Sequence, residues 1–469
     1  MESAAKVGFR VLCVLTAIGT LVYPTYPNYD SYYSLLWGRE ILHAHKPQFE
    51  GFRAPTEHPL ALIAGALLDV FGQLADRIWI ILIWATFLAL IAGVYRLGRV
   101  AFTPLVGIVA GILVLSRFDF AFLAARGYID IPYLALIVWA FALEAEQRRR
   151  GTPVLALLAA AGLLRPEAWL LAGAYWLWLL PELSWRARGL GLAWVLGPPL
   201  LWCAIDGAVT GDALYSLHYT SSSAEDLGRA RTLSEIPGAI PGFLSDIVKP
   251  PVMVAGVAGL LAAVLLVPRR TVWPGLLLAS GILTFFAIGA AGLSAIQRYL
   301  VTGALAVMLF AAVAIAGWTL LEPGTLARRV WSGAAAVLVV VGVVYTALNL
   351  DLRRFDNELR FRGDAHAALE DILDQPAVRT ALDCGPLTFP NHKLVPDSRW
   401  VADLPFDRVY ARLRPPEQAT GVAIVVTGRF AILTQAWTTP TDAALTQTPP
   451  PGWKLVGRTQ YYAAYAHCR

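Results

Sequence analysis

Long apolar segments alternate with short polar ones over the first three quarters of the chain. About twelve segments approach the roughly 20 apolar residues that a helix needs to cross a bilayer, although several are shorter. They lie near residues 8–25, 58–74, 78–95, 102–116, 131–146, 152–165, 168–182, 189–205, 249–267, 272–292, 299–320 and 331–349. The pattern predicts an α-helical polytopic membrane domain over residues 1–350.

The remainder of the chain, residues 351–469, is polar and rich in proline, and it holds no long apolar run. Residues 362–383 predict a helix followed by a turn, and residues 421–427 predict a buried strand. About 120 residues are enough for a separate hydrophobic core. We therefore expect a C-terminal soluble α/β domain.

Basic residues are clustered in several of the connections between apolar segments: Arg96 with Arg99, residues 148–150, Arg186 with Arg188, Arg269 with Arg270, and Arg328 with Arg329. Cytoplasmic loops carry an excess of Lys and Arg, so these clusters predict the cytoplasmic side. The extracytoplasmic side then receives the tail domain and residues 26–57, 117–130, 165–167, 206–248 and 294–298.

The first apolar segment follows Lys6 and Arg10, and we expect it to be a transmembrane helix with a cytoplasmic N-terminus. Twelve full spans would return the C-terminus to the cytoplasm. We therefore expect about eleven spans. Segment 58–74 is the candidate for one that does not cross, because it is short and is flanked by Asp69 and Asp76.

The composition agrees with a membrane location. Hydrophobic residues make up 57% of the chain and charged residues 15%, against about 25% charged in a typical soluble domain. The mean hydropathy of +0.57 excludes a soluble globular enzyme, a disordered chain and a coiled coil. The net charge of +5 is accounted for by basic loops, and no basic stripe with interleaved aromatics is present. We therefore expect the protein to lie in the plasma membrane and not to bind nucleic acid.

The first extracytoplasmic loop has the richest polar chemistry. Residues 31–42 have the pattern of an amphipathic helix lying in the membrane interface. Asp30 stands directly before this helix, where it is a natural N-cap, and a capping role does not exclude catalysis. The other candidate site residues of this loop are Tyr29, Tyr33, Arg53, Glu57 and His58.

A second polar cluster surrounds Asp119, Arg126 and Asp130. Arg126 and Asp130 are four residues apart and share a helix face. A charge at the membrane centre costs about 2.5–3.5 kcal/mol, so such groups usually face a polar cavity. Snorkelling to the interface and an ordinary helix start are the alternatives.

Two more sites complete the set. Arg165 and Glu167 interrupt an otherwise apolar hairpin, and Arg298 opens a late span, where an interfacial anchor is the alternative. A carboxylate can accept the proton of an attacking hydroxyl. The planar fork of arginine matches two phosphate oxygens. Together these groups suit group transfer from a lipid phosphate.

The arrangement resembles the GT-C superfamily of membrane glycosyltransferases. An aspartate, Asp30, soon follows the first span and precedes a Tyr-rich amphipathic helix; a second, Asp130, stands in an Arg-x-x-x-Asp setting; Arg298-Tyr-Leu opens a late helix. Within the superfamily the pattern is most similar to the polyprenyl-phosphate-sugar enzymes of the protein mannosyltransferase and lipid A aminoarabinose transferase type. The resemblance covers roughly residues 1–350.

The resemblance implies inverting transfer of a sugar from a polyprenyl phosphate to an acceptor hydroxyl at the outer face. The first-loop catalytic acid maps onto Asp30, our expected general base, and the second acidic position onto Asp130. Ser31 stands where the family often has a second acid. We expect the donor phosphate to be bound by Arg126, Arg165, Arg298 and His58. A glycan, a lipid and a protein all stay open as the acceptor.

No cofactor is indicated with certainty. A divalent cation held by Asp30 and Glu57 is one alternative; simple exposure of Glu57 and His58 to solvent is the other. In the tail domain, Cys384 and Cys468 lie on the predicted oxidising side, and we expect them to form a disulfide. Residues 390–393, Trp400 and Trp453 are candidate sugar-binding groups.

Two other functions stay open. Intramembrane charges also mark transport pathways, and a lipid-linked glycan flippase would show an internal repeat, which the sequence does not display. An O-antigen-ligase or polymerase-like enzyme would need a large late external loop with arginines. Residues 206–248, with Arg229 and Arg231, are the candidate for that loop.

Overall fold

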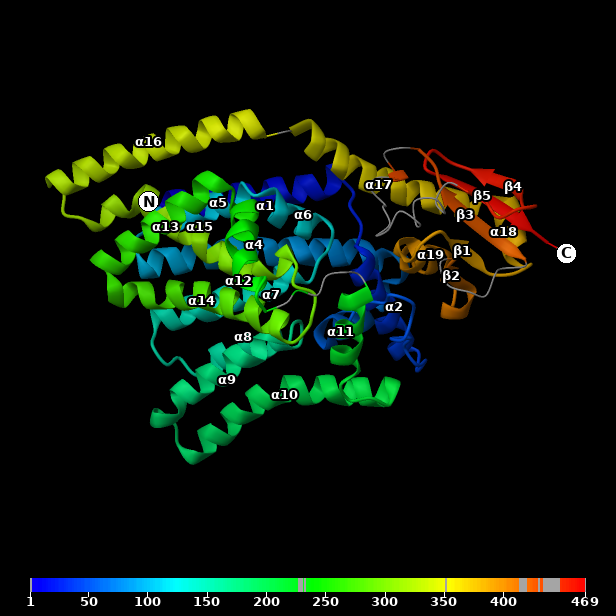
Figure 1. Ribbon diagram of the computed structural model, residues 1–469, viewed down its shortest axis with the longest axis horizontal. Helices are drawn as coiled ribbons and strands as arrows, with labels where there is room; N and C mark the ends of the chain where they lie inside the picture. The colour runs from blue at the N-terminus through cyan, green and yellow to red at the C-terminus, as the bar shows by residue number, and fades with distance from the viewer. Residues whose placement is uncertain are drawn as a thin grey trace.

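The computed structural model describes residues 2–226, 231, 233–350, 352–412, 420–428, 431–432 and 448–468. An elongated helical bundle is followed by a small α/β domain at one of its ends, with the N-terminus near the opposite end (Figure 1). Arg229, considered above for the late loop, lies outside the described residues.

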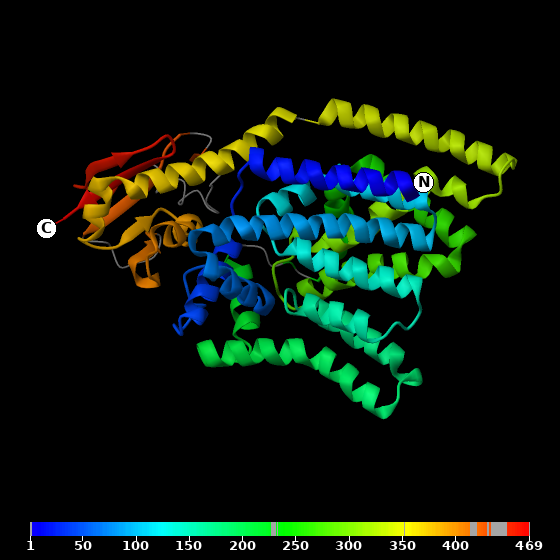
Figure 2. The same ribbon diagram turned by 180° about the vertical axis from the view of Figure 1, so that it is seen from behind.

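The first half of the bundle begins with α1 (Glu2–Val22), α2 (Tyr29–Leu42), α3 (Pro59–Leu68), α4 (Ala75–Ala101), α5 (Pro104–Leu115), α6 (Phe118–Ala125), α7 (Asp130–Glu146), α8 (Thr152–Gly162) and α9 (Glu167–Leu179). The second half comprises α10 (Trp185–Thr210), α11 (Tyr215–Asp226), α12 (Ile236–Val248), α13 (Pro250–Leu266), α14 (Pro268–Ala290), α15 (Val301–Ala316) and α16 (Leu326–Asn349). Helices α10 and α16 lie along opposite edges of the bundle in both views (Figures 1 and 2).

The bundle core is built around α15, which is apolar on all sides and almost completely buried. A helix with no polar face has to be surrounded by other helices, and α15 contacts α5, α13 and α14. Small residues allow close approach: a Cβ added at Gly259 of α13 would collide with the backbone of Phe310 in α15. The exposed apolar faces of α1 and α16 suit contact with lipid.

The number of spans differs from our expectation of about eleven. Among the described residues, six helices are long and apolar enough to cross a membrane, or up to eight if each of two bent pairs is one span. The predicted segments 131–146, 152–165 and 168–182 form α7, α8 and α9, with 17, 11 and 13 residues. These three helices are shorter than the 18 residues required of a candidate span, so the expected number of about eleven spans is not confirmed.

The suspect segment 58–74 does not form a separate span. Helix α3 has ten residues, and a 3-10 turn, η1 (Asp69–Leu74), joins it to α4. At about 1.5 Å per residue, α3 is too short to cross a bilayer alone. Gly72, with a φ of 57°, breaks the helix within a continuous candidate span from Pro59 to Ala101.

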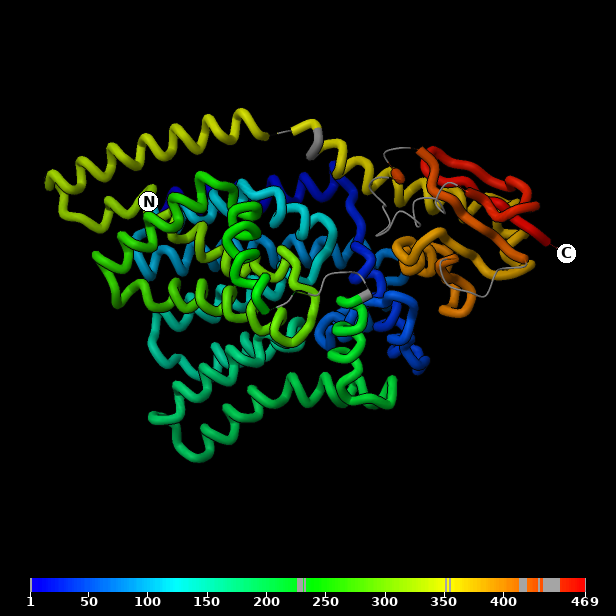
Figure 3. Tube along the Cα trace, in the orientation of Figure 1, coloured from blue at the N-terminus to red at the C-terminus, as the bar shows by residue number. Residues whose placement is uncertain are grey.

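The C-terminal domain contains α17 (Leu352–Asp374), α18 (Pro376–Leu382), α19 (Val395–Ala402), β1 (Leu387–Phe389), β2 (Val409–Ala411), β3 (Gly421–Val426), β4 (Lys454–Arg458) and β5 (Tyr462–His467). The sheet order is β2-β1-β3-β5-β4, with β1 parallel to β2 and β3, and β5 antiparallel to β3 and β4. The predicted strand near 421–427 is β3, which is buried throughout. Helix α17 leads from the bundle into this domain (Figure 3).

Two features fix the C-terminal domain. Cys384 and Cys468, which we expected to pair, form a disulfide that joins the start of the sheet to its last strand. On the bundle side, α19 contacts α2: an Arg399 nitrogen lies 2.6 Å from a Glu40 carboxylate oxygen, and the Arg39 guanidinium lies 3.9 Å from the centre of the Trp400 ring. The domain therefore contacts the helix that contains Asp30 in its first turn.

Candidate active site

A cavity of about 740 Å³ lies between the end of the bundle and the C-terminal domain. It is lined by the N-terminus of α2, the α6–α7 and α8–α9 turns, the turn that precedes α15, and residues of α17 and α19. The predicted site residues among its lining are Tyr29, Asp30, Arg53, His58, Arg126, Asp130, Arg165, Glu167 and Arg298. Residues more than 250 positions apart in the sequence thus share one cavity.

Asp30 is held by the capped start of α2. The cap is Asn28, whose side-chain oxygen accepts hydrogen bonds from the backbone amides of Asp30 (2.7 Å) and Ser31 (3.2 Å). Asn28 also donates from its backbone to the Arg126 carbonyl at 2.7 Å. The expected capping by Asp30 is therefore a role of Asn28, and the Asp30 carboxylate, about one third exposed, lines the cavity.

A buried ion-pair network lies beside Asp30. Arg165 donates to the carboxylate of Asp130, and its Nη2 lies 2.8 Å from Oε1 of Glu167. The Arg165 and Asp130 side chains are only 8% and 2% exposed. The Arg165 guanidinium also lies 4.6 Å from the centre of the Tyr299 ring. Two carboxylates and a ring thus fix this guanidinium in one orientation.

Arg298 lies between Asp30 and Asp130, the two aspartates predicted to be catalytic. Its Nη1 lies 3.6 Å from the Asp30 carboxylate, and its Nε lies 3.8 Å from the Asp130 carboxylate. Both distances exceed those of a hydrogen bond, so the attraction is electrostatic and leaves the guanidinium some freedom. The Arg298 side chain is 31% exposed.

His58 is a neutral group at physiological pH. Burial, together with the positive charge of Arg165, lowers its pKa to about 3. Its Nδ1 is buried and has no hydrogen-bond partner among the described residues. A neutral imidazole still donates one N–H, so His58 can offer a hydrogen bond but no charge.

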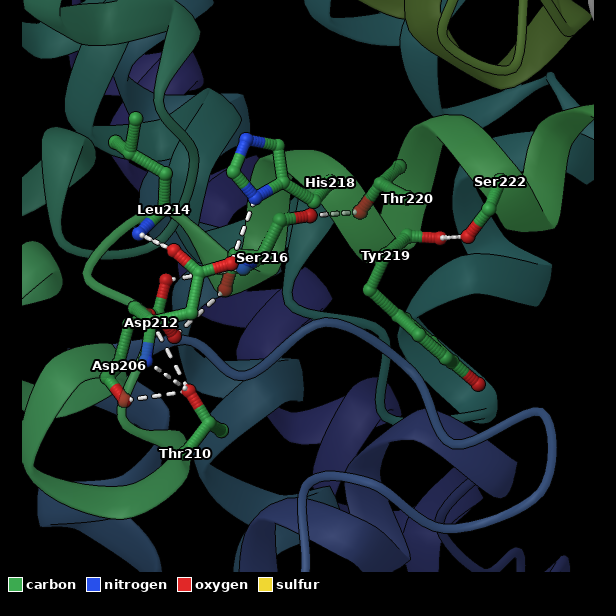
Figure 4. Close-up of polar contacts among 9 residues, drawn as sticks. All are labelled: Asp206, Thr210, Asp212, Leu214, Ser216, His218, Tyr219, Thr220 and Ser222. Atoms are coloured by element: carbon green, nitrogen blue, oxygen red, sulfur yellow. Dashed lines mark hydrogen bonds and ion pairs between the residues drawn. The ribbon is translucent and has the colours of Figure 1, made fainter.

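Glu57 does not itself line the cavity but contacts two residues that do, Ser216 and Asp206. Ser216 Oγ donates to Glu57 at 2.5 Å. Ser216 Oγ also lies 3.0 Å from Asp206, which accepts from the Ser216 backbone amide (Figure 4). Burial and the neighbouring charge of Asp206 raise the pKa of Glu57 to about 9. No sequence pattern predicts this pairing, because Asp206 follows an apolar segment and stands 149 positions after Glu57.

The remaining predicted residues have other surroundings. Tyr29 lines the cavity and donates to the Arg53 carbonyl at 2.6 Å, which orders the first loop. Tyr33 lies in an apolar cluster with Trp37 and Phe49 and does not line the cavity. Asp119, near the start of α6, does not line it either.

The C-terminal domain provides one wall of the cavity, which the sequence did not predict. Among the wall residues are Arg362, His366, His392, Lys393, Asp397 and Tyr462. Two of these, His392 and Lys393, belong to the predicted sugar-binding stretch. Trp400 from the same prediction is 1% exposed beneath Arg39, so it is packed within the domain contact.

The structure gives no support for the alternative of a divalent cation held by Asp30 and Glu57. Across the described parts of the chain, no group of three or more His, Cys, Asp or Glu side chains could hold a metal ion. Glu57 is bonded to Ser216, whereas Asp30 faces Arg298. These donors do not fit a shared metal site, and no chemical step below involves one.

Comparison with known proteins gives matches in structure alone. No family model matches the sequence, and no curated protein matches it. ArnT from Cupriavidus metallidurans in the apo state is similar with a TM-score of 0.56 and 14% identity, over 99% of this chain and 98% of ArnT. An oligosaccharyltransferase from Archaeoglobus fulgidus in the apo form gives a TM-score of 0.48 and 13% identity, over 90% of this chain and 68% of that one.

The similarity to ArnT is one of fold. It covers nearly the whole of both chains, so it includes the C-terminal domain as well as the bundle. The chain therefore has an ArnT-like fold, with a mostly helical bundle and a small C-terminal sheet.

Proposed function

We propose that this chain, which has the fold of ArnT, is a membrane glycosyltransferase that uses a polyprenyl-phosphate-linked sugar. It transfers the sugar to an acceptor hydroxyl with inversion at the anomeric carbon. The observation that carries the proposal is the sequence of contacts from Asp30 through Arg298 to Asp130 and Arg165, in one cavity at the end of an apolar bundle. This arrangement combines a base with cations suited to a phosphate.

Asp30 acts as the general base. Its carboxylate accepts the proton of the acceptor hydroxyl while the hydroxyl oxygen forms a bond to the anomeric carbon. The bond from that carbon to the phosphate oxygen breaks on the opposite face, and its electron pair leaves with the polyprenyl phosphate. Asp30 is suited to this role because the helix start that carries it is held by Asn28 and by the Arg126 carbonyl.

Arg298 and His58 are the groups best placed to receive the phosphate. Arg298 makes only long contacts to its carboxylates, so it can turn toward a phosphate, and His58 has an unpartnered ring nitrogen. Arg165 is saturated by Asp130 and Glu167 and instead contributes a fixed positive field. Arg126, the fourth expected phosphate ligand, faces α17 and α19 and is considered below.

We further propose that the cavity and the C-terminal domain are extracytoplasmic. Arg99 pairs with Glu2 at the N-terminal end of α1, and the pairs of Arg96 with Glu146 and of Arg149 with Glu182 join the basic loops to neighbouring helix ends. That end of the bundle lies away from the C-terminal domain (Figures 1 and 2). The basic end is cytoplasmic by the positive-inside rule, and the opposite end provides the oxidising side that a Cys384–Cys468 disulfide needs.

The test is sugar transfer from a panel of radiolabelled polyprenyl-phosphate sugars by the purified chain. Wild type is expected to consume one donor, and Asp30→Asn is expected to lose activity by about 10²–10⁴-fold because the base is removed. Asp407→Asn, an exposed carboxylate of the C-terminal domain, is the matched control and should match wild type. Retained activity in Asp30→Asn, or consumption of no donor by wild type, contradicts the proposal.

A further inference from the structure

The cavity wall between the two domains contains two charged side chains that the proposed reaction does not use. Arg126 ends α6 in the membrane bundle, and Asp397 lies in the first turn of α19 in the C-terminal domain. Both line the cavity. They come from segments 271 positions apart, so only the docking of the C-terminal domain brings them to one wall.

The backbone of Arg126 is held in place by hydrogen bonds, whereas its side chain has no hydrogen bond to the described residues. Its backbone carbonyl accepts from the amide and from Nδ2 of Asn28, at 2.7 and 3.0 Å. Its guanidinium makes no hydrogen bond or ion pair to a described residue, although it has five N–H groups to donate. Arg362 from α17 lies over the ring of Phe122, one helical turn before Arg126, at 5.8 Å.

The Asp397 carboxylate also lacks a hydrogen-bond partner, among the described residues, for one of its oxygens. Its Oδ1 is buried and has no hydrogen-bond partner in the described part of the chain. Burial raises the pKa of this carboxyl to about 6, against the opposing charges of Arg126 and His366. Buried polar groups in folded proteins nearly always have a partner, so the unsatisfied Asp397 oxygen, on the same cavity wall as the Arg126 guanidinium, indicates a ligand or water.

We propose that Arg126 and Asp397 form a subsite for the hydroxyl groups of a sugar ring. A sugar ring offers neighbouring hydroxyls that accept from a guanidinium and donate to a carboxylate at the same time. A phosphate would suit Arg126 but be repelled by Asp397, and an ammonium group would suit only Asp397. The inference rests on the proposed function, because it places a carbohydrate in the same cavity.

The subsite is next to the proposed base. Asn28, which contacts the Arg126 carbonyl, also caps the helix start at Asp30. The sugar it binds is therefore either the transferred sugar of the donor or a carbohydrate acceptor. The donor sugar and a carbohydrate acceptor offer the same hydroxyl groups to the subsite. Competition by the polyprenyl-phosphate sugar distinguishes between them.

The experiment measures binding without turnover. Saturation-transfer NMR is recorded on the full chain in lipid nanodiscs, with methyl α-mannopyranoside, methyl α-galactopyranoside and methyl β-arabinofuranoside as probes and cyclohexanol as the ring without neighbouring hydroxyls. Wild type should saturate at least one glycoside and not cyclohexanol. Asp397→Asn and Arg126→Gln should each weaken that binding about tenfold. Asp371→Asn, an exposed carboxylate on α17 outside the cavity lining, should bind like wild type.

Melting temperatures of the variants within a few degrees of wild type verify that the losses are local. Displacement of the glycoside by a polyprenyl-phosphate sugar, but not by free polyprenyl phosphate, assigns the subsite to the donor; retention with both assigns it to the acceptor. Equal binding by both variants and wild type, or saturation of no glycoside by wild type, overturns the inference and shows water alone at these groups. Asp30→Asn separates the two proposals, since it should lose transfer while keeping glycoside binding.

Discussion

Asp30, Asp130, Arg165 and Arg298 come from distant segments of the chain and line one cavity. A charge beside a membrane span has few favourable places other than a polar cavity. The contacts that distinguish these four side chains are not visible in the sequence pattern. Saturation of Arg165 and the long contacts of Arg298 depend on side-chain geometry between distant segments.

The same limit applies to Glu57. Its neighbours Ser216 and Asp206 belong to a segment about 150 positions later in the chain. Asn28 is a similar case: Asp30 and Asn28 are both favoured caps by residue type, and only the backbone geometry at the start of α2 decides between them.

Glu57→Gln should make thermal stability less dependent on pH. The pKa of Glu57 is raised to about 9 in the folded chain, against about 4.3 when unfolded, so the folded state holds a proton that the unfolded state has lost. This contribution to stability is complete below the unfolded pKa and is lost as pH rises through 9. The melting temperature of wild type should fall between pH 6 and pH 9 more steeply than that of the variant.

The control is Glu50→Gln, which changes an exposed glutamate of the same loop and should follow wild type at every pH. Parallel melting curves for wild type and Glu57→Gln over this range would show that the two carboxyls do not share a proton.

At the scale of elements, α2 is the helix on which the site depends. It carries Asp30 at its start and contacts α3 along its length and α19 at its end. The sequence predicted an amphipathic helix at 31–42, and α2 covers that range, but most of its side chains are buried beneath α3 and the C-terminal domain. The apolar side chains that predicted contact with the membrane interface instead pack against other parts of the protein.

Gly65→Ala should destabilise the chain and reduce transfer. A Cβ at Gly65 would collide with the Ser34 carbonyl oxygen, and one at Gly38 with the backbone of Ala66, so α2 and α3 cross at these glycines. Overpacking of this kind typically costs about 1–3 kcal/mol and shifts the backbone, here the helix that carries Asp30. Melting temperature and transfer rate are the measurements.

Gly173→Ala in α9 provides the comparison, since a Cβ there has open space around it. Melting of Gly65→Ala at the wild-type temperature would mean that α2 and α3 can separate without cost.

At the scale of the molecule, the hydropathy changes abruptly near residue 350, and the sequence predicts two parts on that ground. The sheet lies in the second part. The sequence does not predict that the two parts enclose the site together. Contact between α19 and α2 depends on a few exposed-looking groups, such as Arg399 with Glu40, which no periodicity distinguishes from surface charges.

Loss of the Cys384–Cys468 disulfide should therefore impair transfer as well as stability. The bond closes a loop with a sequence separation of 84, for which the chain-entropy estimate is about 4–5 kcal/mol. We expect Cys384→Ser to lower the melting temperature of the C-terminal domain and to reduce transfer, because the domain forms a wall of the cavity. Cys13→Ser, which removes a free thiol of α1, should leave both unchanged. Full transfer by Cys384→Ser would show that the wall is dispensable.

The position of Arg298 between two aspartates has a consequence for the order of events. Under the proposed mechanism, Asp30 has to accept a proton while the Arg298 guanidinium lies 3.6 Å away, and that positive charge disfavours the protonated carboxyl. A donor phosphate would compete for the same guanidinium and weaken its hold on Asp30. Binding of the donor would therefore precede activation of the acceptor hydroxyl.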